Sequence, residues 1–150
     1  MKRDKYTVLL VEDNPDDEEL TRLAFKECPV PYELVVAKDG QDALDYLFAA
    51  GKYSERNTCD MPQLMLLDLK LPKINGLEVL KSVRGDVKTM FLPVVVLTSS
   101  KEEQDLINSY ALGANSYIQK PVSFNEFIDT VGQLGMYWLG LNELVYTCSK

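Results

Sequence analysis

The feature that most limits the possible folds of this chain is an unbroken run of four apolar residues, Leu64–Leu67, bounded by Pro62 and Pro72. Four residues are too few for a buried helix, and such a run is typical of a strand covered on both faces. Asp68 follows this strand directly. It is therefore placed at the carboxyl end of the strand, which is the edge where open parallel sheets bind their ligands.

Strand and helix patterns alternate along the rest of the chain. Further β-rich runs occupy residues 6–11, 32–37, 93–97 and 116–119. Helices are predicted to begin after Asn14, Asp39, Asn75, Ser100 and Ser123, the last two with the spacing of capping boxes. Residues 52–62 carry no period and predict an exposed loop. Five β-α units favour a doubly wound α/β fold, with a five-stranded parallel sheet of flavodoxin-like order 2-1-3-4-5 and helices on both faces.

The composition excludes several classes of function. A formal charge of −7 argues against a nucleic-acid surface, and no apolar stretch is long enough to span a membrane. The chain has no histidine, which excludes histidine-dependent hydrolysis, imidazole zinc sites and an internal phosphohistidine. Three cysteines without a CxxC motif indicate reduced thiols, so we expect a cytoplasmic protein.

Polar side chains follow four of the predicted strands, at what would be one edge of the sheet: Glu12, Asp13, Asp68, Thr98 and Lys120. Taken singly, each has a plainer explanation, such as a helix dipole for the acidic pair, a cap for the threonine or a solvated charge for the lysine. Their coincidence at adjacent strand ends favours a joint site. Carboxylates without His or Cys favour Mg²⁺, and a hydroxyl and an ammonium suit a phosphoryl group. The central acid, Asp68, would be the nucleophile.

These residues, together with Pro72, Gly76 and Pro121, resemble the response-regulator receiver (CheY-like) domain over about residues 5–135. The resemblance implies that Asp68 is the phosphoacceptor and that Asp13, Asp68 and the Lys70 backbone carbonyl bind Mg²⁺, with Glu12 reaching it through water. It implies that Thr98 and Lys120 hold the phosphoryl group and that Tyr117 is the switch aromatic. It further implies a cis peptide bond before Pro121. The loop before the third strand and the ending 136–143 are similar to response regulators of cyanobacterial phytochromes.

We therefore expect a single-domain response regulator that takes a phosphoryl group from the phosphohistidine of a sensor histidine kinase, of the phytochrome type. It would be a phosphoacceptor with at most slow autodephosphorylation rather than an enzyme. Phosphorylation would alter the face formed by the fourth helix, fifth strand and fifth helix. Two alternatives remain open. One is an aspartyl-phosphate phosphohydrolase, disfavoured by Lys70 where a second Asp is usual, and the other is a degenerate receiver serving as a binding module.

The C-terminal part of the chain is rich in aromatic residues. We divide the chain into a receiver domain, residues 1–135, and an extension, residues 136–150. Large apolar side chains in this extension suit an interface core, so we expect a homodimer that uses Tyr137, Trp138 and Leu141. The alternative is that the extension packs back onto the fifth helix or the sheet edge of its own chain.

Overall fold

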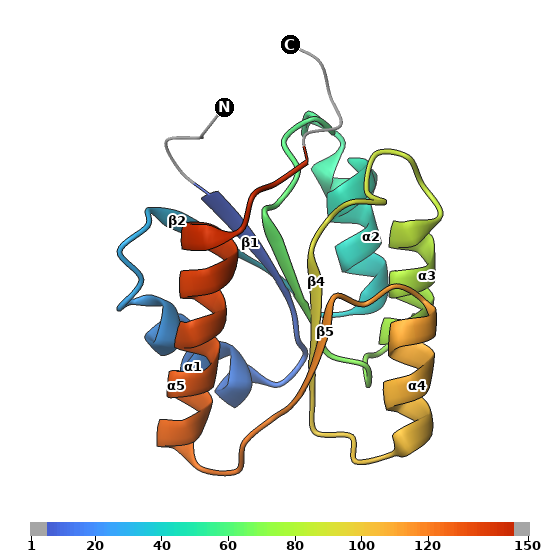
Figure 1. The fold of residues 1–150 in the computed structure, drawn as a ribbon. Helices are drawn as coiled ribbons and strands as arrows, with labels where there is room; N and C mark the ends of the chain where they lie inside the picture. The colour runs from blue at the N-terminus through green and yellow to red at the C-terminus, as the bar shows by residue number, and fades with distance from the viewer. Residues whose placement is uncertain (1–5, 146–150) are drawn as a thin grey trace.

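The computed structural model describes residues 6–145, in which parallel strands alternate with helices (Figure 1). The strands are β1 (Tyr6–Val11), β2 (Tyr32–Ala37), β3 (Leu64–Leu67), β4 (Val94–Thr98) and β5 (Ser116–Gln119). The helices are α1 (Pro15–Phe25), α2 (Gly40–Phe48), α3 (Gly76–Arg84), α4 (Glu103–Ala111) and α5 (Phe124–Gly135). A 3-10 helix, η1 (Gly51–Tyr53), follows α2, and a π-helical segment, η2 (Met136–Leu141), continues α5. Within residues 6–145 no helix combines the length and the apolar character needed to cross a membrane.

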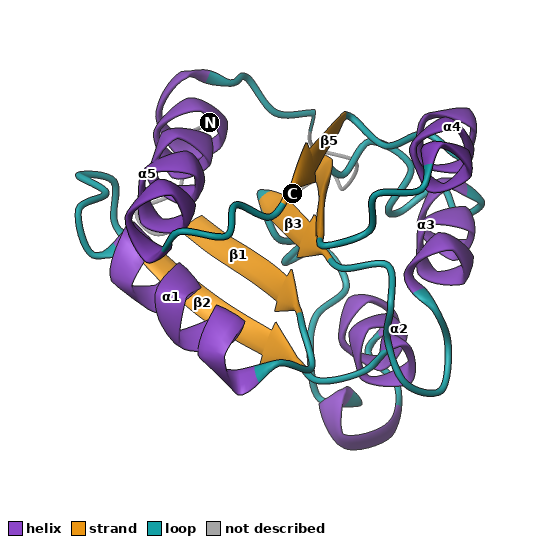
Figure 2. Cartoon of the chain, turned by 90° about the horizontal axis from the view of Figure 1, so that it is seen from below, coloured by secondary structure: helices purple, strands orange, loops and turns teal. Residues whose placement is uncertain are grey.

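The sheet has the order β2-β1-β3-β4-β5 with every neighbouring pair parallel, so the predicted fold class is confirmed. Helices α1 and α5 cover one face of the sheet, and α2, α3 and α4 cover the other (Figures 1 and 2). Both faces of β3 and β4 are therefore buried. This arrangement explains why these two strands are apolar without alternation.

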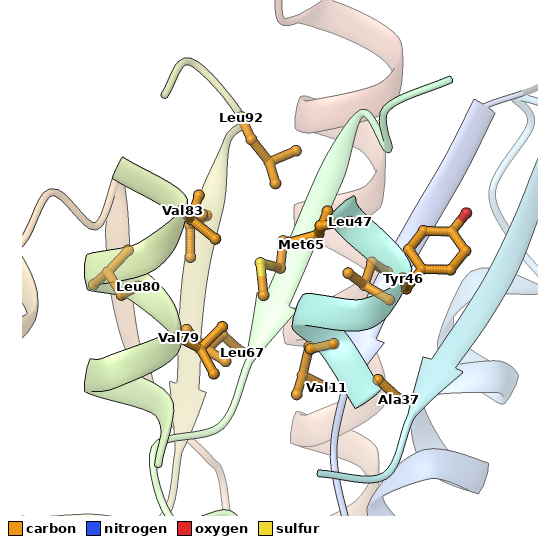
Figure 3. Close-up of a cluster of buried hydrophobic side chains, with 13 residues drawn as sticks. Val11, Ala37, Tyr46, Leu47, Met65, Leu67, Val79, Leu80, Val83 and Leu92 are labelled. Atoms are coloured by element: carbon orange, nitrogen blue, oxygen red, sulfur yellow. The ribbon is translucent and has the colours of Figure 1, made fainter. Parts of the chain in front are cut away.

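The alternation of side chains along each strand divides the core into two clusters. Leu9, Val11, Met65 and Leu67 point to the face covered by α2 and α3, where Leu47, Val79 and Leu80 pack against them (Figure 3). The intervening strand residues, Val8, Leu10, Leu64 and Leu66, pack with Phe25, Phe127 and Val131 on the opposite face. Burial on both sides holds the central strands rigidly, and with them the side chains that follow their ends.

Four helices begin at the predicted caps. The side chains of Asn14, Asp39, Asn75 and Ser123 each accept a hydrogen bond from a backbone N–H in the first turn that follows. The capping box expected at Ser100 is wrong. Its hydroxyl donates to Asp105 Oδ2 at 2.6 Å and accepts from Glu102 N at 3.3 Å, so α4 begins only at Glu103.

The segment 52–62 is not simply an exposed loop. It begins within η1, and the guanidinium of Arg56 lies 3.8 Å from the centre of the Tyr46 ring while donating to the Tyr46 and Asp60 carbonyl oxygens. The expectation of reduced thiols holds for Cys28, which is free, but is wrong for Cys59, which is disulfide-bonded. Sequence spacing alone does not report such a pairing. Cys148 and the rest of residues 146–150 lie outside the described residues.

Candidate functional site

Three carboxylates converge at the carboxyl ends of the two central strands. Val11 pairs with Leu67 in the register of β1 and β3, which places Glu12 beside Asp68. Oxygen atoms of Glu12, Asp13 and Asp68 lie within 4.8 Å of one another. Glu12 and Asp68 are buried, at 3% and 7% exposure, whereas Asp13 is exposed to solvent. The sequence prediction that these acids form one cluster is confirmed.

The turn after Asp68 depends on a glycine. A Cβ atom on Gly76 would lie 2.3 Å from the Asp68 carbonyl oxygen and 2.6 Å from the Leu69 Cα, well inside van der Waals contact. The Gly76 N–H donates to the Leu69 carbonyl at 2.8 Å. Only a residue without a side chain allows α3 to start this close to the end of β3.

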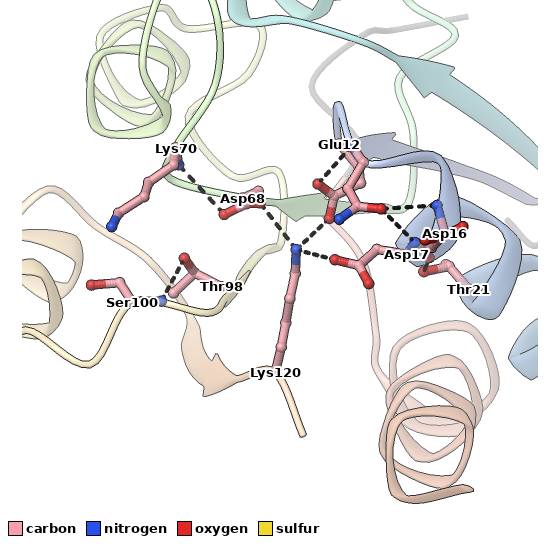
Figure 4. A network of polar contacts seen from close by, with 10 residues as sticks. Glu12, Asp16, Asp17, Thr21, Asp68, Lys70, Thr98, Ser100 and Lys120 are labelled. Atoms are coloured by element: carbon pink, nitrogen blue, oxygen red, sulfur yellow. Dashed lines mark hydrogen bonds and ion pairs between the residues drawn. The ribbon is translucent and has the colours of Figure 1, made fainter. Parts of the chain in front are cut away.

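Lys120 connects the acids of three elements. Its ammonium lies 2.6 Å from Glu12 Oε1, 3.0 Å from Asp68 Oδ2 and 2.7 Å from Asp17 Oδ2 (Figure 4). The Lys120 N–H also donates to the Thr98 carbonyl at 2.7 Å, which fixes the backbone beside β4. Lys120 was correctly predicted from the sequence to lie at this edge, but Asp17 was not, because an acid in the first turn of a helix is ordinarily explained by the helix dipole.

Burial and charge shift the ionisation of this cluster. Desolvation raises the pKa of Glu12 to about 7, although the hydrogen bond and the charge of Lys120 act to lower it. Burial alone would lower the pKa of Lys120, but its hydrogen bonds to Asp17 and Glu12 and the charge of Asp68 raise it above its ordinary value. The lysine therefore stays a cation, and its single ammonium faces three carboxyl groups.

The donor set fits a hard divalent cation. All three clustered acids offer oxygen ligands, which Mg²⁺ prefers, and the exposed Asp13 gives the site access to solvent. Lys70, whose N–H donates to Asp68 Oδ1 at 3.4 Å, lies at the same turn and points its side chain away from Asp68 (Figure 4). The role of the Lys70 carbonyl as a metal ligand stays a prediction.

Thr98 and Tyr117 lie on the β4–β5 side of the site. The buried Thr98 hydroxyl accepts from Ser100 N at 3.3 Å, and Figure 4 draws no hydrogen bond between Thr98 and Asp68. The Tyr117 hydroxyl is shielded from solvent without a hydrogen-bond partner in the described part of the chain. Burial raises the pKa of this phenol, the nearby Ser100 side chain acts to lower it, and the charges of Asp105 and Asp68 act to raise it. The groups that act on the Tyr117 hydroxyl thus include Ser100 and acids at the start of α4.

A cavity of about 420 Å³ opens beside the acids, between the turn after β3 and the start of α4. Asp13, Lys70, Pro72, Glu102 and Asp105 are among the residues that line it. Of the three clustered acids, Asp13 lines this cavity, so a small ligand within it would reach the exposed side of the cluster.

The expected cis peptide bond before Pro121 is wrong, since every peptide bond in the described residues is trans. Trans is the intrinsically favoured isomer even before proline, by about 0.5–1 kcal/mol. The trans chain still delivers Lys120 to the acids, as its three contacts demonstrate.

The predicted interface residues lie away from this site. Lys120 precedes the start of α5, whereas η2 follows the C-terminal end of that helix (Figure 1). Tyr137 and Leu141 are exposed, at 50% and 75%, whereas Trp138 packs partly against the core, and Leu139 is buried there. The Tyr137 and Trp138 rings meet edge to face with their centres 5.0 Å apart. The extension thus combines intramolecular packing with an exposed apolar surface.

The chain is similar to known proteins in both sequence and structure. The family profile of the response regulator receiver domain matches residues 8–132. The chain is 39% identical over 139 residues to FilR2 of Methanothrix harundinacea, a probable methanogenesis regulatory protein, covering 93% of this chain and 87% of FilR2. It is 36% identical over 132 residues to the response regulator Rcp1 of Synechocystis, covering 88% of each chain.

Two crystal structures are similar over nearly their whole length. The Mn²⁺-bound form of Rcp1 has a TM-score of 0.87 and 35% identity, covering 93% of this chain and 99% of the other. The phosphorylated cyanobacterial phytochrome response regulator RcpA has a TM-score of 0.88 and 37% identity, covering 93% and 98%.

Proposed function

The chain belongs to the response regulator receiver family of two-component signalling, and from this membership we propose that Asp68 accepts a phosphoryl group from the phosphohistidine of a sensor kinase. The observation that carries the proposal is the ammonium of Lys120, which joins Asp68 to Glu12 within a cluster of three convergent carboxylates. This arrangement combines a nucleophile, a cation-binding set and a fixed positive charge at one point.

The reaction is a transfer between two protein side chains. A carboxylate oxygen of Asp68 attacks phosphorus, a P–O bond forms, and the P–N bond to the imidazole of the partner breaks. The electron pair of the P–N bond stays on the imidazole nitrogen, which takes a proton from solvent as needed. The products are an aspartyl phosphate on this chain and an unphosphorylated histidine on the kinase. Since this chain has no histidine, the phosphohistidine that donates the group belongs to another protein.

Different residues around Asp68 would bind the metal ion and the phosphoryl oxygens. Glu12, Asp13 and Asp68 would hold Mg²⁺, which when bound neutralises their charge and binds phosphoryl oxygens. Lys120 is positioned to donate to a phosphoryl oxygen by a charge-assisted hydrogen bond, since it already lies 3.0 Å from Asp68 Oδ2. The Thr98 hydroxyl supplies a further donor once it leaves its contact with Ser100.

The alternatives from the sequence are less well supported. The position two residues after the nucleophile is occupied by Lys70, whose side chain points away from Asp68, so no second acid is available there for a phosphohydrolase (Figure 4). A binding module that had lost its chemistry would lack at least one of the site residues. Each of them is present at the sheet edge, which argues against such a module. Because Lys70 also leaves no second acid for a phosphohydrolase, we propose a phosphoacceptor rather than an enzyme with turnover.

We propose that the phosphoryl group alters the surface of α4, β5 and α5 through Thr98 and Tyr117. Movement of Thr98 toward the phosphoryl group would release Ser100, which lies near the buried Tyr117 hydroxyl. Leu106, Ile107 and Tyr110 leave α4 with an exposed apolar face, at 38%, 52% and 51% exposure. This face is the surface whose contacts we expect to change.

We propose a phytochrome-type histidine kinase as the donor. Rcp1 and RcpA support it, because RcpA is a phytochrome response regulator and both match this chain along nearly its full length. FilR2 is named as a probable methanogenesis regulatory protein, so similarity to this chain is not confined to proteins named for phytochromes. Phosphotransfer from a panel of purified kinases with labelled ATP and Mg²⁺ would identify the partner, and preferential transfer from a non-phytochrome kinase would overturn this assignment.

Labelling of Asp68 tests the phosphoacceptor function itself. We expect Asp68→Asn to abolish Mg²⁺-dependent labelling by a histidine kinase or acetyl phosphate, because an amide is a poor nucleophile toward phosphorus. Asp129→Asn, a substitution of an exposed acid on α5, is the control and should label like the wild type. Equal labelling of Asp68→Asn and the wild type would refute the assignment.

We also propose that the exposed side chains of η2 form a homodimer contact. Tyr137 and Leu141 are large, apolar and exposed. Contact between two such surfaces around a twofold axis would bury these side chains in both copies of the chain. Tyr137→Glu should shift the mass measured by light scattering from dimer to monomer while Asp68 still labels. A wild-type protein that is monomeric at high concentration, with and without beryllofluoride and Mg²⁺, would end this proposal.

A further inference from the structure

The ammonium of Lys120 has a third carboxylate partner, Asp17, that lies outside the cation-binding cluster. Asp17 is in the first turn of α1, and its Oδ2 lies 2.7 Å from Lys120 Nζ (Figure 4). Glu12 and Asp68 accept from the same ammonium at 2.6 and 3.0 Å. An ammonium has three N–H donors, so each of them has one carboxylate acceptor in this structure.

Asp17 is held in place independently of the sheet edge. Its backbone N–H donates to Asn14 Oδ1 at 3.2 Å as part of the helix cap, and its carbonyl accepts from the Thr21 hydroxyl at 2.8 Å. Its side chain is 22% exposed, so it is less buried than Glu12 or Asp68 and costs less to keep charged. The carboxylate thus stands on a rigid helix start, next to the site but not within it.

The three carboxylate partners of Lys120 are not equally placed to bind a divalent cation. Oxygen atoms of Glu12 and Asp68 belong to the cluster that converges within 4.8 Å, and a cation there would compete with the ammonium for both. Asp17 is not a member of that cluster. A cation bound at that cluster would therefore leave the hydrogen bond between Asp17 and Lys120 without a competitor.

We infer that Asp17 is a positioning residue for the phosphoryl-transfer step, retaining the Lys120 ammonium beside Asp68 when a divalent cation occupies Glu12, Asp13 and Asp68. Lysine has a long flexible stem, and a cation at the cluster repels its charge. An ammonium anchored by Asp17 keeps two free N–H donors directed at the site, where a phosphoryl group on Asp68 presents its oxygens. This inference rests on the proposed phosphoacceptor function and adds a residue to it.

The test compares two neighbouring acids of the same helix turn. Asp17→Asn removes the charged acceptor, and Asp16→Asn removes the same charge from an exposed residue that no dashed line joins to Lys120 in Figure 4. With saturating Mg²⁺ and acetyl phosphate, we expect Asp17→Asn to slow labelling of Asp68 about tenfold and Asp16→Asn to change it less than about twofold. Asp17→Glu should recover part of the lost rate, because a carboxylate is restored.

A second readout does not depend on labelling. Calorimetric titration with Mg²⁺ should give a dissociation constant about fivefold higher for Asp17→Asn than for the wild type, since the displaced ammonium has lost its remaining partner. In a Lys120→Met background there is no ammonium to anchor. There, Asp17→Asn should weaken Mg²⁺ binding no more than Asp16→Asn does. Such a cycle separates an effect through Lys120 from a general effect of charge or of helix structure.

Each outcome decides the inference. Slow labelling by Asp17→Asn that is coupled to Lys120 in the titrations supports it. Labelling at the rate of Asp16→Asn, or a Mg²⁺ effect that persists undiminished in the Lys120→Met background, overturns it while the phosphoacceptor function stands. A wild-type protein that is not labelled at Asp68 overturns the proposed function, and this inference with it.

Discussion

Replacing Lys120 with methionine tests how the acid cluster is held together. The substitution keeps a linear side chain of similar size and removes the positive charge that pairs with Glu12, Asp17 and Asp68. The Lys120, Glu12 and Asp68 side chains are 8%, 3% and 8% exposed, so little water screens the carboxylates left behind. Removing one partner of a buried ion pair costs about 3–5 kcal/mol. We expect Lys120→Met to lose stability in that range when no metal is present.

Urea unfolding in EDTA, followed by far-UV circular dichroism, would measure this loss. The matched control is Lys38→Met, because Lys38 also forms an ion pair with an acid, Glu18, but is 59% exposed. Exposed pairs contribute about 0–1 kcal/mol, so the control should remain close to the wild type.

The same experiment repeated with Mg²⁺ tests the cause of the loss. A divalent cation among Glu12, Asp13 and Asp68 would neutralise the charge that Lys120 neutralised before, so the stability difference between Lys120→Met and the wild type should shrink. A loss below about 1 kcal/mol in EDTA, or a loss that is unchanged by Mg²⁺, would refute the view that charge compensation by Lys120 stabilises this cluster.

Three further outcomes follow from the geometry of the site. Burial raises the pKa of Glu12 from 4.5 to about 7, so the native state binds more protons than the unfolded state between these values, and the stability of the metal-free protein should fall as pH rises through that window. Glu12→Gln should reduce this dependence of unfolding free energy on pH, measured by urea unfolding from pH 4.5 to 7.5. An unchanged pH dependence would mean that another group causes it. Gly76→Ala should destabilise the protein by more than about 2 kcal/mol in the same assay, because its Cβ meets the Asp68 carbonyl at 2.3 Å, whereas Gly85→Ala, whose nearest contact is 3.3 Å, should cost less than about 1 kcal/mol. Thr98→Ala should still label at Asp68 but should lose the shift of the Tyr117 resonances on addition of beryllofluoride and Mg²⁺, and an intact shift in NMR spectra would exclude the route through Thr98.

The strands, their order and the position of the acids were predictable from the sequence. Continuous apolar runs such as 64–67 and 94–97 can only be buried on both faces, and helix caps such as Asn14 and Asn75 act within three residues of themselves. Once β1 and β3 are known to be neighbours, their carboxyl ends must lie together, so Glu12, Asp13 and Asp68 had to converge. These features depend on local periodicity and on a general rule for parallel sheets.

Other features required the packed structure. Helix α4 begins later than predicted because the Ser100 hydroxyl donates to Asp105 and accepts from Glu102 N instead of accepting from the N–H of Glu103, and local spacing cannot report which partners a hydroxyl selects. The peptide bond before Pro121 is trans, although the resemblance implied cis. In the extension, Leu139 is buried while Leu141 is exposed, a division set by where η2 meets the core.

The most consequential feature that only the tertiary structure decided is the environment of Lys120. Its contact with Asp17 joins residues 103 positions apart, and its contacts with Glu12 and Asp68 span 108 and 52 positions. The sequence by itself determined which charged residues the strand ends carry, because strands and helix starts follow from short-range patterns. Which carboxylates share the ammonium, and how deeply each is buried, depends on the packing of α1 and β5 around the sheet edge, and electrostatic strength follows from that distance and burial.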